Sequence, residues 1–158
     1  MSYTQHSRSS KTYSPNDVVL TPKLVFDQLG VKFDLDPAHP PFPTNVPCKR
    51  YYTEKDDGLA QPWEGLVWLN PPYSNPTPWI EKWLSHGNGI MLVQVSRSNA
   101  YLKLWNDPNV RIVHQRGKHM AFDLPDGSKK GIFMPVALFA IGSRAINILQ
   151  AADLGQMR

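Results

Sequence analysis

Short apolar runs separated by helical segments are the feature that most constrains the fold of this chain. The runs contain few polar residues, as expected for strands that are covered on both faces, and the segments between them have the apolar periodicity and caps of helices. Such an alternation predicts an α/β fold with a mostly parallel sheet. The predicted strands span 31–36, 65–69, 89–95, 110–115 and 135–142, and the predicted helices span 21–30, 77–87, 98–107 and 143–155.

Residues of the types that begin and end helices flank these segments. Thr21 and Ser98 are good caps, and Pro22 suits the first helical position. The pair Thr77-Pro78 repeats this signal, and Gly30 suits a helix end. These residues predict where the helices begin and end.

Two other segments break the alternation. A Pro-Asp-Gly turn lies between short apolar arms in 122–133, which predicts an antiparallel hairpin near the C-terminus. Residues 37–62 are rich in proline and polar residues and are expected to be irregular. A loop that long inside a compact domain is usually functional.

The length and composition indicate one globular domain. The polar residues 1–14 are expected to form a flexible tail, and residues 15–158 a single domain. No apolar run is long enough for a membrane helix, and the N-terminus lacks the apolar core of a signal peptide. Cys48 is the single cysteine, so it cannot form an internal disulfide. One cysteine is too few for a structural zinc site, and the histidines do not have the spacing of metal ligands. These features predict a protein of a reducing cytoplasm with no metal and no membrane partner.

The tetrapeptide Asn70-Pro71-Pro72-Tyr73 follows one of the apolar runs and precedes a predicted helix. In a sheet of this kind, the loops after the strands are where ligands bind. The asparagine side chain and a proline carbonyl can accept hydrogen bonds from both hydrogens of an NH₂ group, and the rigid prolines fix their directions. Tyr73 offers a ring on which a planar base can stack. The loop therefore suits a planar amine that is held in line with an electrophilic methyl group.

This tetrapeptide matches the [Asp/Asn/Ser]-Pro-Pro-[Tyr/Phe] motif of S-adenosylmethionine-dependent amino-methyltransferases. The segments "FDLDPA", "RYYTEKDDGLAQPWEG" and "VWLNPPYS" occur in that order, and a Pro-Trp helix follows them. Together they resemble the phage-type DNA N6-adenine methyltransferase family, known as phage Dam, over residues 20–142. The resemblance implies a Rossmann-like methyltransferase sheet and methyl transfer from S-adenosylmethionine to the N6 amine of adenine in DNA.

The resemblance also implies roles for residues of the loop. Asn70 and the carbonyl of Pro71 would accept hydrogen bonds from the adenine amine, and Pro72 would keep the loop rigid. Tyr73 would stack on an adenine flipped out of the duplex, because its amine is poorly accessible inside the helix.

Two acidic segments resemble cofactor-binding motifs of the family. Asp36-Pro37-Ala38 would hold the methionine part of S-adenosylmethionine, and Asp57 would meet the edge of its adenine. The general methyltransferase motif continues from Asp-Pro into a glycine-rich turn, whereas this chain continues with "HPPFPT". Either the family binds the cofactor with a different loop, or this chain binds it weakly.

Each motif also has a simpler interpretation. Pro-Pro-Tyr can stiffen a loop or bind a proline-recognising module. Asp36 can cap a turn before Pro37, and Asp57 precedes Gly58 in a common turn pair. Trp79 and Trp83 are four residues apart, which puts them on one helix face and predicts a packing role.

Basic and hydroxyl residues indicate where double-stranded DNA would bind. Ser96, Arg97 and Ser98 lie between a predicted strand and helix, where they can meet a substrate backbone. Arg116 and Lys118 add positive charge near a strand end, and the net charge of the chain is +4. Salt-sensitive binding to DNA phosphates is therefore expected.

The sequence leaves other activities open. The same loop suits an adenine in RNA or the amide of a protein glutamine. A basic nucleic-acid-binding module with a decayed cofactor pocket is the alternative that is not an enzyme, and the glycine-poor segment keeps it open. Pairing with a second copy of the chain is also open. The family resemblance favours a DNA-modifying enzyme encoded by a phage or prophage and acting in the cytoplasm of a bacterial host.

Overall fold

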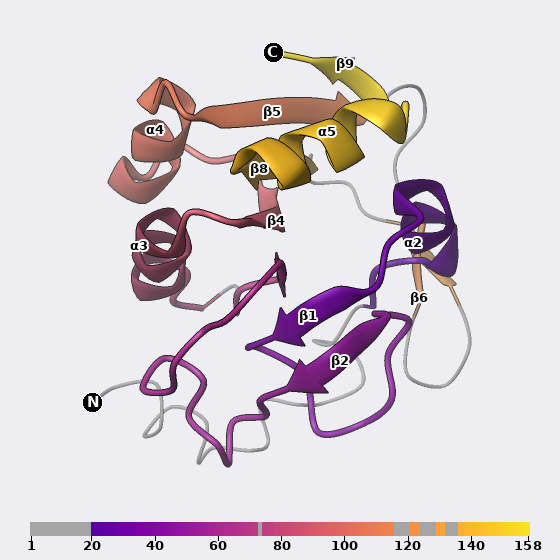
Figure 1. Cartoon of the computed structure of the whole chain (residues 1–158), viewed down its shortest axis with the longest axis vertical. Helices are drawn as coiled ribbons and strands as arrows, with labels where there is room; N and C mark the ends of the chain where they lie inside the picture. Colours follow the sequence, from indigo (N-terminus) through magenta and orange to yellow (C-terminus); the bar gives the residue numbers. More distant parts are fainter. Residues whose placement is uncertain (1–19, 73, 116–120, 124–128, 132–135) are drawn as a thin grey trace.

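The computed structural model describes residues 20–72, 74–115, 121–123, 129–131 and 136–158. Its main feature is a seven-stranded sheet in the order β2-β1-β3-β4-β8-β5-β9 (Figure 1). The helices are α2 (Lys23–Leu29), α3 (Thr77–His86), α4 (Asn99–Asn106) and α5 (Ser143–Ala151). The strands are β1 (Phe33–Asp36), β2 (Cys48–Tyr51), β3 (Val67–Leu69), β4 (Gly89–Gln94), β5 (Val110–Gln115), β6 (Ala121–Asp123), β7 (Lys129–Gly131), β8 (Val136–Ile141) and β9 (Gly155–Met157).

The sheet has a parallel half and an antiparallel half. Strands β2, β1, β3 and β4 run parallel to one another, whereas β8 is antiparallel to both of its neighbours, β4 and β5. Strand β9 adds an antiparallel edge next to β5. The predicted α/β class with a Rossmann-like sheet is confirmed. The chain passes from β1 to β2 on one side and returns to β3 on the other, which creates a topological switch point between β1 and β3.

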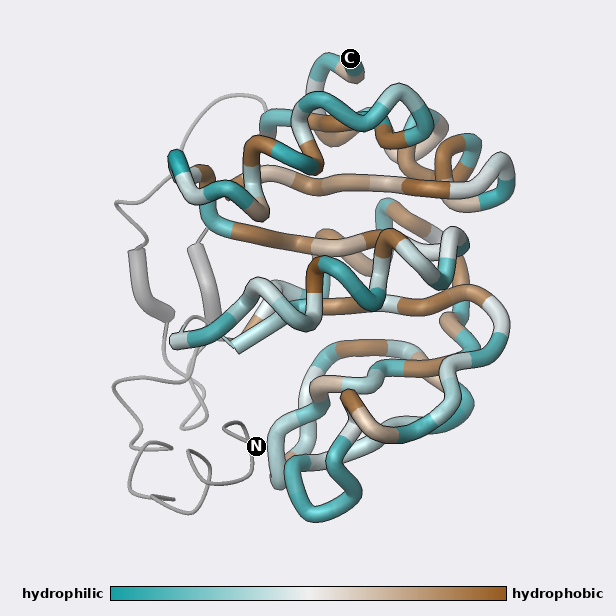
Figure 2. The backbone as a smooth tube through the Cα atoms, turned by 90° about the vertical axis from the view of Figure 1, so that its left-hand side faces the viewer, coloured by the Kyte–Doolittle hydropathy of each residue, from teal (hydrophilic) through white to brown (hydrophobic). Residues whose placement is uncertain are grey.

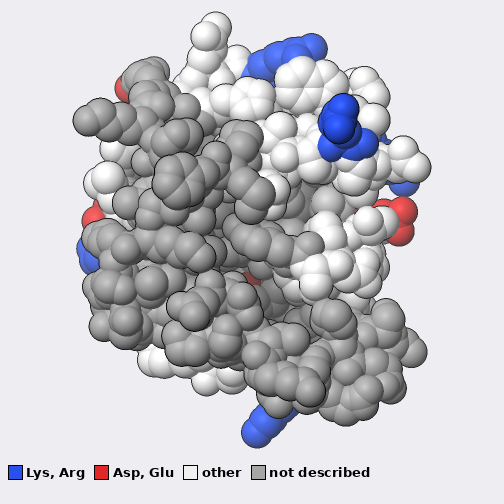
Figure 3. All heavy atoms as spheres, turned by 180° about the vertical axis from the view of Figure 1, so that it is seen from behind, with Lys and Arg blue, Asp and Glu red and all other residues white. Residues whose placement is uncertain are grey.

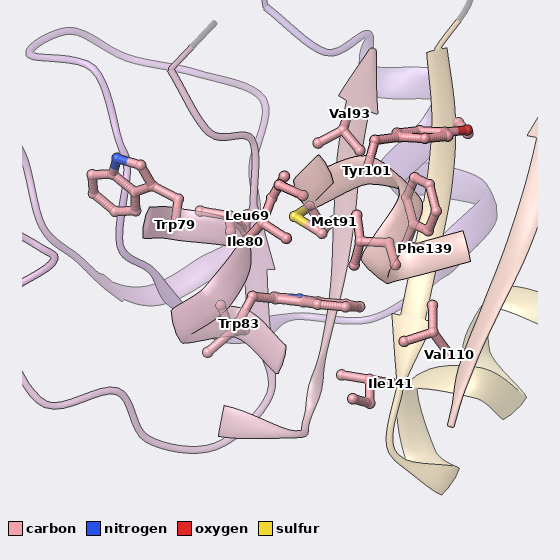
Figure 4. Close-up of a cluster of buried hydrophobic side chains, with 14 of the residues drawn as sticks. Leu69, Trp79, Ile80, Trp83, Met91, Val93, Tyr101, Val110, Phe139 and Ile141 are labelled. Atoms are coloured by element: carbon pink, nitrogen blue, oxygen red, sulfur yellow. The ribbon is translucent and has the colours of Figure 1, made fainter. Parts of the chain in front are cut away.

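Helices cover both faces of the sheet (Figure 1). Helices α3 and α4 lie on one face and α2 and α5 on the other, and the strands between them are the most hydrophobic part of the chain (Figure 2). Trp79 and Trp83 of α3 are buried against β3 and β4 in the core of the first face (Figure 4). This confirms the packing role predicted from their spacing. The aromatic core fixes α3, and with it the loop that precedes α3, against the sheet.

The helix caps follow the sequence only in part. Ser98 accepts the Tyr101 backbone N–H at 3.2 Å, as its position predicted. Gly30 ends α2 in the left-handed region, with φ of 64°, where glycine has no steric cost. The predictions for Thr21 and Thr77 were wrong, because the capping positions of α2 and α3 are Pro22 and Pro76. Proline has no side-chain acceptor, so neither of these helices has a side-chain cap.

Two strands were missed by the sequence analysis. Strand β2 lies inside the segment 37–62 that was expected to be irregular, and β9 follows the closing helix. Strand β2 is an edge strand, and most of its residues are exposed and polar. It therefore lacks the apolar run that marks a central strand. Strand β9 has only three residues, which is too short for a visible pattern.

The hairpin predicted for 122–133 is supported by its described arms. Strands β6 and β7 pair antiparallel as a separate two-stranded sheet, with Phe122 opposite Lys130. The turn between them and the predicted tail at 1–14 lie outside the described residues. Within the part of the chain that is described, no helix is long and apolar enough to cross a membrane.

Candidate active site

The carboxyl ends of β1 and β3 bring two of the sequence motifs together. The two strands are parallel neighbours, with Leu35 opposite Val67, so the loops that follow them leave the sheet at the same edge. Asp36 is the last residue of β1, and Asn70 directly follows β3. In sheets of this kind, ligands bind in the crevice between the loops on the two sides of a switch point.

Asp36 is a buried acid without a positive partner among the described residues. The residue is only 3% exposed, and its Oδ1 accepts a hydrogen bond from the Ala38 backbone N–H at 3.1 Å. Burial raises the pKa of this carboxyl to about 7, and the hydrogen bond from Ala38 opposes that shift. The hydrogen bond from Ala38 shows that Asp36 does cap this turn, as the simpler interpretation expected. It leaves unexplained why the turn uses a buried carboxyl, which is costly to ionise without a cation.

The Asp36-Pro37 turn touches the loop that contains Asp57. Gly58 packs so closely on this turn that a Cβ at its position would collide with the Pro37 carbonyl oxygen. The loop is also held by the Trp63 indole N–H, which donates to the Gly58 carbonyl at 2.9 Å. Asp57 itself has φ of 56°, the left-handed region that residues with a side chain rarely adopt. The two segments predicted to bind the cofactor are thus adjacent in space, although Asp36 and Asp57 are 21 residues apart in the sequence.

The Asn70 loop presents two hydrogen-bond acceptors that no described residue uses. Asn70 is half-buried and Pro71 is buried, yet neither the Asn70 side chain nor the Pro71 carbonyl has a hydrogen-bond partner in the described part of the chain. Pro72 is half-buried, and Tyr73 lies outside the described residues. A short segment leads from this loop into α3, whose tryptophans anchor it in the core.

The predicted DNA contacts lie one strand further along the same edge. Ser96, Arg97 and Ser98 follow β4 and are exposed, and the hydroxyl oxygens of Ser96 and Ser98 are 3.1 Å apart. Arg116 and Lys118 lie outside the described residues. On the face shown in Figure 3, Lys and Arg side chains lie apart from one another, near the top and at the lower and side edges. Exposed Arg97 and the neighbouring hydroxyls have the chemistry for phosphate contacts.

Sequence reasoning missed two features near this edge. His39 is 9% exposed and stacks on Tyr51 at the end of β2, with ring centroids 4.1 Å apart. Its Nδ1 lies 2.6 Å from the Pro40 carbonyl oxygen, and burial lowers the pKa of the imidazole. The second feature is Lys82 of α3, whose side chain reaches back to the loop after Asp57. A charged residue on an amphipathic helix gives no sign of such a contact, so only the structure reveals it.

The fold and the candidate site together indicate the class of protein to which this chain belongs. A parallel half-sheet with an antiparallel strand between β4 and β5, a buried acid after β1 and a free amide and carbonyl after β3 are consistent with a Rossmann-like methyltransferase.

Comparison with known proteins identifies the family within that class. The family model for DNA N-6-adenine-methyltransferase (Dam) matches residues 8–131, so the chain belongs to this family.

Two curated relatives carry the same name. The DNA N-6-adenine-methyltransferase of Haemophilus phage HP1 (strain HP1c1) is 31% identical over 108 residues, which cover 62% of this chain and 61% of that protein. The DNA N-6-adenine-methyltransferase of Escherichia phage T1 is 36% identical over 76 residues, which cover 44% of this chain and 31% of that protein. The chain thus matches less than two thirds of either relative. No solved structure gives a significant match.

Proposed function

We propose that this protein transfers a methyl group from S-adenosylmethionine to the N6 amine of adenine in double-stranded DNA. Membership of the DNA N-6-adenine-methyltransferase family is the observation that carries the proposal. The acceptors of Asn70 and Pro71, which no described residue uses, and the buried Asp36 at the end of the neighbouring strand support it, because they offer an amine site and a cation site at one switch point. We further propose that residues 15–158 act as a single domain in the cytoplasm of a bacterial host.

The amine side of the site is formed by the Asn70 loop. The Asn70 side-chain oxygen and the Pro71 carbonyl accept the two amine hydrogens, which draws electron density onto the nitrogen and orients its lone pair. Holding the amine in this way lowers the barrier chiefly by orientation. Pro72 stiffens the loop, and Tyr73 stacks on the extruded base.

The cofactor side is formed by the Asp36 turn and the loop containing Asp57. S-adenosylmethionine supplies a sulfonium-bound methyl group as the electrophile. Its methionine part carries an ammonium group, which is the kind of partner that the buried Asp36 lacks among the described residues. Pro37 and Ala38 complete the turn, and Asp57 meets the adenine edge of the cofactor; the close packing of Gly58 on the Pro37 carbonyl supports this, because it brings the two segments together. The residues present therefore fit this cofactor by charge, even without a glycine-rich turn.

The DNA is held by groups outside the amine site. Arg97 and Ser98, together with Arg116 and Lys118, contact the phosphate backbone beside the extruded adenine. Such contacts position the duplex and make binding sensitive to salt.

A transfer assay with tritiated S-adenosylmethionine tests this function. DNA, RNA and protein are offered separately, and the labelled DNA is digested to nucleosides to find the modified base. We expect label in DNA alone, as N6-methyladenine. Label in RNA or on protein glutamine would assign a different acceptor. If the protein binds DNA but transfers no methyl group and binds no cofactor, it is a nucleic-acid-binding module and the proposal is wrong.

A further inference from the structure

Lys82 makes an unusual set of contacts for a helix lysine. Its ammonium donates hydrogen bonds to two backbone carbonyls of one loop, to Leu59 at 2.7 Å and to Gln61 at 2.6 Å. The same nitrogen lies 5.2 Å from the ring centroid of Trp63, within the range of a cation–π interaction. The side chain is half-buried, so these contacts replace part of the water that a surface lysine would keep.

The loop that Lys82 holds is the one assigned to the cofactor. It contains Asp57 and Gly58, and two backbone hydrogen bonds shape it, from Ala60 to Asp57 and from Gln61 to Gly58. On its other side Gly58 packs on the Pro37 carbonyl. The loop is therefore clamped between the Asp36 turn on one side and α3 on the other.

The helix that carries Lys82 is the one that the amine-binding loop enters. Asn70 lies 12 residues before Lys82, and the intervening chain leads into α3. Trp79 and Trp83 lie on either side of Lys82 in the sequence and are buried in the core. The helix is therefore a rigid support for both the Asn70 loop and the loop that Lys82 holds. Trp79 also lies close to Gly58, which adds an apolar contact to the polar tie of Lys82.

The electrostatics agree with a constrained lysine. Burial lowers the pKa of Lys82, and the carboxylate of Asp57 acts in the opposite direction. The carbonyls of Leu59 and Gln61 stabilise the ammonium in its half-buried position, because hydrogen bonds to a charged group are stronger than neutral ones.

We propose that Lys82 is a positioning residue that couples the cofactor side of the site to the amine side. By fixing the loop 57–61 to α3, it sets the position of Asp57 relative to Asn70 before the cofactor arrives. S-adenosylmethionine then binds to a preformed loop rather than ordering a loose one, which lowers the cost of binding. This inference rests on the proposed function, and it assigns Lys82 no contact with the reacting atoms.

The first experiment compares Lys82→Met, Lys82→Arg and the matched control Lys103→Met by calorimetry with S-adenosylmethionine. Methionine keeps an apolar stem against Trp63 but cannot donate to the carbonyls, whereas arginine can. Lys103 is an exposed lysine on α4 and has no contact with this loop. We expect Lys82→Met to weaken cofactor binding about tenfold, Lys82→Arg to restore most of it, and Lys103→Met to bind as the unmodified protein does.

Kinetics separate positioning from a general loss of structure. We expect Lys82→Met to raise KM for S-adenosylmethionine by the same factor, while kcat at saturating cofactor changes by less than about twofold. Hydrogen exchange in the absence of cofactor is expected to become faster at the amides of Ala60 and Gln61, with the core strands unchanged.

A measurement on the unmodified protein covers the case in which Lys82→Met does not fold. Cofactor binding is expected to protect the amides of 57–61 and those of α3 around Lys82 together. Protection of one segment without the other would overturn the coupling. Cofactor binding by Lys82→Met equal to that of the unmodified protein would also overturn it. If the unmodified protein itself binds no S-adenosylmethionine, the failure lies in the proposed function rather than in Lys82.

Discussion

The two ends of strand β1 place the same residue type in opposite environments. Near its amino end, Asp34 accepts the Leu66 backbone N–H at 2.7 Å and pairs with the Lys49 ammonium at 3.2 Å. The hydrogen bond from Leu66 is the main reason that the pKa of Asp34 is lowered, and Lys49 adds to it. At the carboxyl end, Asp36 has a single backbone hydrogen bond, and burial raises its pKa to about 7.

This difference suggests a structural role for Asp34 and a functional role for Asp36, although both lie in one strand. The protein itself satisfies Asp34, which ties β1 to β3 and to edge strand β2. Among the described residues nothing of positive charge pairs with Asp36, and the acceptors of Asn70, at the end of the neighbouring strand β3, have no partner either. We infer that changes near Asp34 affect stability and changes at the carboxyl edge affect activity.

The largest effect is expected for Asn70→Ala. This change removes one of the two acceptors that we propose for the amine, and losing one preorganised hydrogen-bonding group typically lowers kcat by about 10²–10³-fold. Methyl transfer measured with tritiated cofactor should fall by at least this range. Thermal unfolding and cofactor affinity should stay unchanged, since Asn70 makes no hydrogen bond within the described chain. Full methylation by the variant would remove Asn70 from the site.

Asp36 should give the protein a characteristic dependence of stability on pH. Burial raises its pKa in the folded protein from the ordinary value of 3.8 to about 7, so the folded state binds the proton more tightly than the unfolded state. Stability therefore falls as pH rises from about 4 through 7, by at most about 4 kcal/mol. Urea unfolding from pH 5 to 8 should show this loss in the unmodified protein and not in Asp36→Asn. Parallel curves for the two proteins would mean that Asp36 ionises freely.

Asp34→Ala is the counterpart at the other end of the strand. It leaves the Leu66 N–H without its acceptor and Lys49 without its partner, which should lower the free energy of unfolding by about 1.5–3 kcal/mol. In the unmodified protein this contribution is lost as pH falls through the lowered pKa of Asp34. Denaturant unfolding measures the change, and methyl transfer by the folded fraction should be normal. A variant of full stability but low activity would reverse the assignment of the two ends.

The smallest effect is expected for Tyr101→Phe, near the start of α4 at the carboxyl edge. The Tyr101 side chain lies against Phe139 and Val93, and its hydroxyl is buried without a hydrogen-bond partner in the described residues (Figure 4). Burial raises the pKa of this hydroxyl, so it stays protonated at neutral pH. Removing it should leave stability unchanged or raise it by about 1 kcal/mol or less. A clear loss of stability in thermal unfolding would show that the hydroxyl has a partner.

The sequence predicted the central elements because their signals are local. Strands β3 and β4 have apolar runs, β1 alternates apolar and acidic residues, and the Ser98 cap and Gly30 end follow from single residues. Strand β2 and the position of β8 between β4 and β5 could not be predicted in this way, since pairing of edge and inserted strands depends on the rest of the sheet.

The site was predictable to a similar extent. The motifs around Asp36, Asp57 and Asn70 predicted its parts, and in the structure the first and last of them lie at the carboxyl ends of neighbouring parallel strands. The packing of Gly58 on Pro37 and the reach of Lys82 could not be predicted, because they depend on how a loop folds back onto a helix. The roles of all the site residues remain predictions, and Tyr73, Arg116 and Lys118 also lie outside the described residues.

Calorimetric titration of S-adenosylmethionine into Asp36→Asn and Asp34→Asn, side by side, is the most direct test of the difference between the two ends of β1. Both changes replace a carboxylate with an amide of nearly the same shape, two residues apart. We expect Asp36→Asn to lose at least about tenfold in affinity, or about 1.4 kcal/mol, and Asp34→Asn to bind as the unmodified protein does. Equal affinity in both variants, or a greater loss in Asp34→Asn, would contradict the placement of the cofactor at the carboxyl edge of the sheet.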